Sequence, residues 1–217
     1  MLTSDISAAM VSAALAHGLP AIRQAADALL LADNSVDAVL LAYGSHHIAL
    51  EDRPRAVAEA VRVVRPGGKV ILHDFDPASP MALFFRTVVD PHAPGGHDYP
   101  HYTRRQLQAL FRSQPVVLSL HDVYDPLVLP GTSPDRAKAA MLSYLANSYG
   151  LAPYFATLGP TAGWDLLATA FDHTCFCAEL ATCPTAAPRP VVRSSGKRFL
   201  VEVPRVATVA VAEKRAA

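Results

Sequence analysis

Two adjacent histidines follow an apolar run in the first quarter of the chain. The run covers residues 36–43 and ends at Tyr43, and Gly44, Ser45, His46 and His47 come next. Imidazole titrates near neutral pH, so a histidine at the end of a strand can take a proton from a hydroxyl or an amine. We therefore consider His46 and His47 as catalytic general bases, with a histidine that only caps the next element as the alternative.

A second candidate pair, His73 and Asp74, lies near the end of another apolar run, residues 69–75. The carboxyl ends of parallel strands meet at one edge of a sheet, which would bring this pair to the same edge as His46. Neighbouring residues on a strand point to opposite faces, so only one of the two can face a site at that edge.

Three more histidines, His92, His97 and His101, lie in a segment rich in proline and glycine, residues 76–102. Imidazole groups are good ligands for divalent ions, but this spacing fits no metal motif. We interpret the segment as a long loop that covers the substrate.

The cysteines of the chain are grouped at Cys175, Cys177 and Cys183. Their number is odd, and the group lacks the fourth ligand and the C-x-x-C spacing of common zinc sites. Packing cysteines in a reducing compartment are the simpler interpretation. The sequence therefore predicts no metal site.

The elements that must position these residues alternate between strand and helix. Runs typical of strands cover residues 2–6, 21–26, 36–43, 69–75 and 115–121, and helical patterns cover 8–17, 53–64 and 103–111. This alternation predicts an α/β fold with a mainly parallel sheet and helices on both faces. The run 36–43 is almost continuously apolar, which is typical of a strand buried on both faces and therefore central in the sheet.

The pattern changes beyond Pro130. Helices are expected over 133–149 and 162–171, an irregular segment over 175–190, and strands over 198–203 and 206–211. We interpret the chain as one domain, residues 1–217, with a sheet core at 2–129 and 191–217 and a helical insertion or lid at 130–190.

Composition excludes several classes of partner. Lysine plus arginine equals aspartate plus glutamate, 19 each, so no excess positive charge is available for nucleic acid or an anionic membrane. No apolar run reaches the roughly 18 residues of a membrane span. The N-terminus has no basic stretch before an apolar one, so no secretory signal is expected and the cytoplasm is the predicted location. A small molecule is the expected substrate.

Four segments in order carry a likeness to a known family. They are residues 5–10, 26–28, 33–39 and 59–70, which read DISAAM, ADA, DNSVDAV and EAVRVVRPGGKV. Together they resemble the class I S-adenosylmethionine-dependent methyltransferases of the small-molecule type, over roughly residues 2–122. The resemblance implies a Rossmann-like sheet and S-adenosylmethionine as cofactor.

The resemblance also assigns binding residues. Asp5, with Ile6 after it, matches the acid that binds the ribose hydroxyls of the cofactor, and Asp27 with Ala28 matches the segment that contacts the adenine. Tyr43 begins the segment after the central strand, where the family often places residues that face cofactor and substrate.

One family feature is missing. The family has a first strand and a G-x-G-x-G loop before the acid that Asp5 matches, whereas four residues precede Asp5 here and the chain contains no G-x-G. The nearest glycine pattern, residues 159–163, would require a permuted topology. The open place in the sheet could be filled by a start upstream of Met1, by a strand from a second copy or a partner chain, or by the C-terminal strands.

Three functions remain open from the sequence. The first is S-adenosylmethionine-dependent methyl transfer to a small organic substrate, such as a secondary metabolite. The second is a related protein that has lost methyl transfer and catalyses another reaction, of the cyclase or lyase type. The third is a subunit that depends on a homo-oligomer or a partner chain to complete its sheet.

Overall fold

The computed structural model describes residues 1–174 and 186–216. The chain divides into two compact units, and each is a distinct body. Unit 1 consists of Met1–Asp74, Tyr102–His121 and Val209–Ala217, and unit 2 of Phe75–His101 and Asp122–Thr208. Strands β5 (Val116–Tyr124) and β9 (Val206–Lys214) each contain a boundary between the units.

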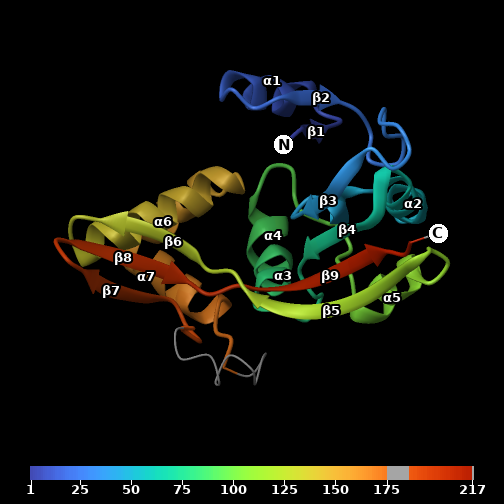
Figure 1. Cartoon of the computed structure of the whole chain (residues 1–217). Coiled ribbons are helices and arrows are strands. Elements are labelled where there is room, and N and C mark those ends of the chain that lie inside the picture. The colour runs from blue at the N-terminus through green and yellow to red at the C-terminus, as the bar shows by residue number, and fades with distance from the viewer. Residues whose placement is uncertain (175–185, 217) are drawn as a thin grey trace. The chain divides into compact units, whose positions relative to one another are not determined.

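Unit 1 begins with a small β-α-β element, seen at the blue end of the chain in Figure 1. Strands β1 (Thr3–Asp5) and β2 (Ala21–Arg23) pair in parallel around helix α1 (Ala8–Ala16). The Ser7 side chain accepts a hydrogen bond from the Met10 amide and so caps the helix. Gly18, at φ 75°, turns the chain towards β2.

A second element of unit 1 contains β3 (Val36–Ala42), α2 (Arg53–Val63) and β4 (Val64–Asp74). Strands β3 and β4 are parallel, and the sheet runs β3-β4-β9-β5. Helix α5 (Arg104–Phe111) precedes β5 and begins at a capping box formed by Thr103 and Gln106.

Helix α2 supplies one side of the core of unit 1, because its apolar residues recur three and four apart. Val57, Ala60 and Val61 belong to a buried cluster with Val70 and Leu72 of β4. The other members of that cluster come from the segments that follow: Val64, Tyr102, Leu107, Phe111, Val116, Ala210 and Ala212.

Residues 65–68, which lie between the helix and the strand expected from the sequence, form a bulge inside β4 in the structure. The β3 to β4 register jumps there, from Val36 opposite Val64 to Ala38 opposite Lys69. Gly68 allows the two backbones to approach, since a Cβ at this position would lie 2.5 Å from the Asp37 carbonyl oxygen.

Unit 2 contains a helical stretch and an antiparallel sheet. The stretch consists of α3 (Pro80–Phe84), a π-helical turn η2 (Phe85–Val89) and α4 (Asp90–His92). The sheet runs β6-β8-β7 and is formed by β6 (Leu127–Gly131), β7 (Val191–Ser195) and β8 (Arg198–Val203). Helices α6 (Pro134–Ser148) and α7 (Ala152–Ala170) complete the unit, and α6 contacts this sheet.

The α/β class predicted from the sequence is confirmed, but the single mainly parallel sheet is not. The described residues form three sheets, and one of them is antiparallel. Within the described residues β3 pairs only with β4, so the strand predicted to be central is an edge strand, and its Leu40 is 62% exposed. The reason is that a continuous apolar run specifies a strand but not the neighbours it pairs with.

Several boundaries also differ from the sequence prediction. Residues 80–92 are largely helical rather than a loop, because Ser79 caps α3 through the Ala82 amide. Strands β6 and β7 were not predicted. Helix α7 begins ten residues earlier than expected, at Ala152, and the glycine pattern at 159–163 lies within it as a kink, with Gly159 at φ 73°. None of the described helices is long and apolar enough to cross a membrane.

Candidate functional site

The site is built at the carboxyl ends of β3 and β4 in unit 1. Tyr43 leaves β3 at φ 52°, a left-handed conformation that few residues other than glycine adopt. The chain then forms a short 3₁₀ turn, η1 (Ser45–His47). This sharp exit places the turn beside Asp74, the last residue of β4. The region outside the carboxyl ends of the strands is where open α/β sheets bind ligands.

Asp74 organises the turn. Its carboxylate accepts hydrogen bonds from the Ser45 hydroxyl at 2.8 Å, from the His46 amide at 3.2 Å and from His46 Nδ1 at 2.9 Å. His46 is 3% exposed and Asp74 is 1% exposed. Hydrogen bonds to an ionised group in such a buried place are stronger than those in water, so the His46 ring has a fixed orientation.

A second layer of contacts supports the turn from behind. Arg53, at the start of α2, donates from Nη2 to the His46 carbonyl at 2.7 Å and from Nε to the Ile48 carbonyl at 3.0 Å. The Tyr102 hydroxyl donates to the Ser45 carbonyl at 2.8 Å, and the Arg53 guanidinium lies 4.3 Å from the centroid of the Tyr102 ring. Burial raises the pKa of Tyr102, which keeps its hydroxyl protonated as a donor.

The arrangement suits acid–base chemistry at His46. A carboxylate can only accept, so Nδ1 carries the proton that is shared with Asp74. In the neutral ring Nε2 is then the basic nitrogen, and a proton taken up there would give an imidazolium stabilised by Asp74. The neighbouring His47 is exposed, and its ring centroid lies 4.4 Å from that of His46.

Tyr43 and His73 form a second pair at the same strand ends. The Tyr43 hydroxyl lies 3.1 Å from His73 Nε2, and the ring centroids are 4.4 Å apart. His73 and Asp74 therefore have different partners, as expected for neighbours on a strand.

The predicted ribose-binding acid lies at the end of β1. Asp5 accepts a hydrogen bond from the Ser7 amide at 2.7 Å and is partly buried, whereas Ile6 is 68% exposed. Asp27 forms an ion pair with Arg55 of α2, and the neighbouring Ala28 is exposed. Asp5 is thus the last residue of β1, and Asp27 lies in the segment that follows β2.

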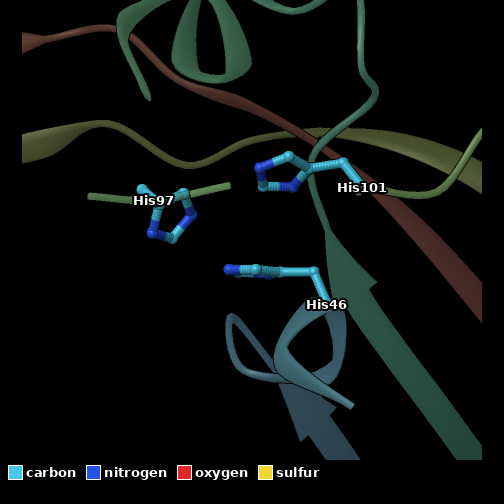
Figure 2. Close-up of side chains that lie close together, drawn as sticks. All are labelled: His46, His97 and His101. Atoms are coloured by element: carbon cyan, nitrogen blue, oxygen red, sulfur yellow. The ribbon is translucent and has the colours of Figure 1, made fainter. Parts of the chain in front are cut away.

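The three histidines of the segment 76–102 belong to unit 2. His97 and His101, both drawn in Figure 2, have ring centroids 5.9 Å apart, and each stacks on Phe85. His92 stacks instead on Tyr154, with the ring centroids 3.7 Å apart. Cys175, Cys177 and Cys183 lie outside the described residues.

Sequence reasoning identified His46 and the His73–Asp74 pair separately. It missed the contact between His46 and Asp74, and it missed Ser45, Arg53 and Tyr102 as their supports. The sequence contained one signal for these supports. Arg53 is the first residue of a helix with an apolar face, and a charged residue that becomes buried there needs polar partners. Tyr102 gave no signal, because nothing in its local sequence indicates the turn that it contacts.

Known proteins resemble the first part of the chain most clearly. Residues 1–72 match the family model described as a methyltransferase domain. Demethylmenaquinone methyltransferase of Mycolicibacterium paratuberculosis is 30% identical over 112 residues, which cover 52% of this chain and 43% of the relative. The enzyme of the same name from Renibacterium salmoninarum is 36% identical over 85 residues, 39% of this chain and 30% of the relative. The chain therefore spans less than half the length of these relatives.

Solved structures agree on the fold. YcgJ of Bacillus subtilis superposes with a TM-score of 0.52 at 18% identity, covering 100% of this chain and 82% of that one. An S-adenosylmethionine-dependent methyltransferase of Methanosarcina mazei gives a TM-score of 0.50 at 12% identity, covering 100% and 82%. These superpositions show the fold of the chain, and the match in sequence over residues 1–72 is to a methyltransferase domain.

Proposed function

We propose that this protein transfers a methyl group from S-adenosylmethionine to a small organic molecule, with His46 as the general base. The observation that carries the proposal is the buried contact between His46 Nδ1 and the Asp74 carboxylate at 2.9 Å. It lies at the carboxyl ends of two parallel strands, in a chain whose residues 1–72 match a methyltransferase domain.

His46 and Asp74 divide the work between them. His46 takes the proton from the substrate atom that is to be methylated, so that this atom becomes a better nucleophile. Asp74 does not touch the substrate: it is a positioning residue that holds the ring and stabilises the imidazolium that forms. Ser45, Arg53 and Tyr102 fix the turn, so the base needs little reorganisation during the reaction.

Asp5 and its neighbours supply the groups that fit the cofactor. The Asp5 carboxylate can accept hydrogen bonds from a ribose diol, and its one hydrogen bond within the described part of the chain comes from Ser7. We propose that Asp5 and Ile6 bind the ribose, that Asp27 and Ala28 bind the adenine, and that Tyr43 borders the methyl donor. S-adenosylmethionine supplies an electrophilic methyl group when it is bound.

The substrate class is a further part of the proposal. The curated relatives carry the name demethylmenaquinone methyltransferase, which makes a quinone ring the first substrate to test. We propose a small aromatic substrate, or a quinone in its reduced quinol form, with an ionisable hydroxyl on which a histidine base can act.

Calorimetric titration with S-adenosylhomocysteine, together with a radiolabelled methyl-transfer assay on demethylmenaquinone chemically reduced to its quinol, tests the proposal. We expect binding that Asp5→Ala weakens, and transfer that His46→Gln lowers by about 10² or more, the usual scale for a general base. His121→Gln is the matched control, because His121 is exposed and contacts Ser119. A folded chain that does not bind the cofactor product would overturn the proposal.

A further inference from the structure

The segment between β2 and β3, which we call the 24–35 loop, links the two sheets of unit 1 and carries Asp27 and Ala28. Few of its backbone amides donate hydrogen bonds to backbone carbonyls. The Ala28 amide donates to the Ala25 carbonyl, and the next amides to donate to backbone carbonyls are those of Asn34 and Ser35. The middle of the loop must therefore be held by other groups.

Two side chains of α2 hold it. Arg62 donates from Nη2 to the Leu29 carbonyl at 3.0 Å and from Nη1 to the Leu31 carbonyl at 2.9 Å. Glu59 accepts a hydrogen bond from the Leu29 amide at 2.9 Å. The backbone of the loop is thus hydrogen-bonded to one positively charged and one negatively charged side chain, both from the same face of α2.

The two side chains also hold each other. Arg62 donates from Nε and Nη2 to the two oxygens of Glu59, at 2.7 and 2.8 Å, which is the bidentate geometry of a strong pair. Arg62 also contacts Asp33 of the loop at 2.6 Å. The hydrogen bond from Arg62 lowers the pKa of Glu59, so both groups stay ionised near neutral pH.

Apolar packing gives the loop little support. Leu30 is 72% exposed, so its side chain does not anchor the segment. The Leu30 amide is bound by the Gln24 side chain at 2.8 Å, which is again a polar contact. The position of Asp27 and Ala28 therefore depends on polar side chains: Arg55 pairs with Asp27 itself, and the Glu59–Arg62 pair holds the residues that follow.

We propose that Arg62 and Glu59 are positioning residues for cofactor binding, which hold the 24–35 loop in the conformation that presents Asp27 and Ala28 to the adenine. This inference rests on the proposed function, because it assumes that the loop contacts the cofactor. Neither residue touches the ligand: each acts through the backbone of residues 29–31.

The test compares Arg62→Met with Arg65→Met. Arg65 lies three residues further along the chain, in β4, and pairs with Asp37 at 2.8 Å, where both side chains are mostly exposed. Titration with S-adenosylhomocysteine should give an affinity about tenfold weaker for Arg62→Met, the scale seen when outer supports of binding groups are lost. Arg65→Met should bind as the unchanged protein does, and Arg62→Lys should fall between the two.

Hydrogen exchange separates positioning from general stability. In Arg62→Met the Leu29 and Leu30 amides should exchange faster, while the amides of β4 keep their protection. Equal affinity of Arg62→Met and the unchanged protein, measured well below both melting temperatures, would overturn the inference. Unchanged exchange at Leu29 and Leu30 would also overturn it.

The outcome for the unchanged protein keeps the two proposals apart. If it binds S-adenosylhomocysteine and Arg62→Met binds equally well, only the positioning role fails. If the unchanged protein does not bind, the proposed function fails, and the positioning role fails with it because its ligand is wrong.

Discussion

Helices α1 and α2 both connect parallel strands in unit 1, yet they differ in what they bury. None of the nine residues of α1 is buried, and Met10 and Leu15 are 58% and 55% exposed. Six of the eleven residues of α2 are buried. Both helices lie in the region that matches the family model. A segment can therefore match the family model without contributing to the core. The stability of the unit comes from the β3-α2-β4 half.

The candidate site residues are also divided between the exposed and the packed half of unit 1. Asp5 and Asp27 belong to the exposed β1-α1-β2 half, whereas His46 and Asp74 lie on the packed half. Regions with few buried apolar contacts open more easily. We therefore expect the proposed cofactor groups to be more mobile than the proposed base.

The largest effect should come from deleting apolar volume in the packed half. Leu72 is 1% exposed in the core of unit 1, so Leu72→Ala should cost about 2–5 kcal/mol in the free energy of unfolding. Leu15→Ala in α1 should cost less than about 0.5 kcal/mol. Urea unfolding measures both, and equal losses would contradict the division between the two halves.

A smaller effect is expected when the buried polar network loses its acceptor charge. Asp74→Asn should cost about 1–3 kcal/mol, because groups of Ser45 and His46 lose a charged partner in a buried place. Methyl transfer should also fall, with a smaller change in the affinity for S-adenosylhomocysteine. Asp5→Asn is the counterpart in the exposed half, where we expect the affinity to change more than the stability.

The C-terminal strand is tied to the packed half by Lys214. Its ammonium donates to the carbonyls of Val61 and Val64 at 2.8 Å each, near the end of α2, where carbonyls lack helical partners. Lys214→Met should therefore cost about 1–2 kcal/mol. Lys197→Met, on the connection between β7 and β8, is a control on an exposed residue, and an equal loss there would contradict this role.

The smallest effect concerns pH. The pKa of Glu59 is lowered in the folded state from its ordinary value of 4.5, chiefly by the hydrogen bond from Arg62. Its contribution to stability is therefore present above pH 4.5 and is lost as the pH falls through the folded pKa. Glu59→Gln should flatten this part of the stability curve. Thermal unfolding between about pH 7 and pH 3 measures it, and parallel curves would show that the pair does not contribute.

The sequence alone determined the local elements where its signals agree. The helical patterns over 53–64, 8–17 and 133–149 predicted α2, α1 and α6. These succeed because helix periodicity and capping depend on residues three or four positions apart. The resemblance to the methyltransferases followed from the sequence for the same reason, since its motifs are short and ordered, and a methyltransferase domain model matches residues 1–72.

The tertiary structure decided how those elements combine. Ser45 and His46 meet Asp74 across about 28 residues of chain, and Glu59 reaches the Leu29 amide across 30. The apolar run of β3 likewise did not determine that this strand lies at a sheet edge, because that position depends on the strands with which it pairs. Such contacts depend on which strands pair and how the chain leaves them, as the left-handed turn at Tyr43 does, and no local pattern encodes that choice.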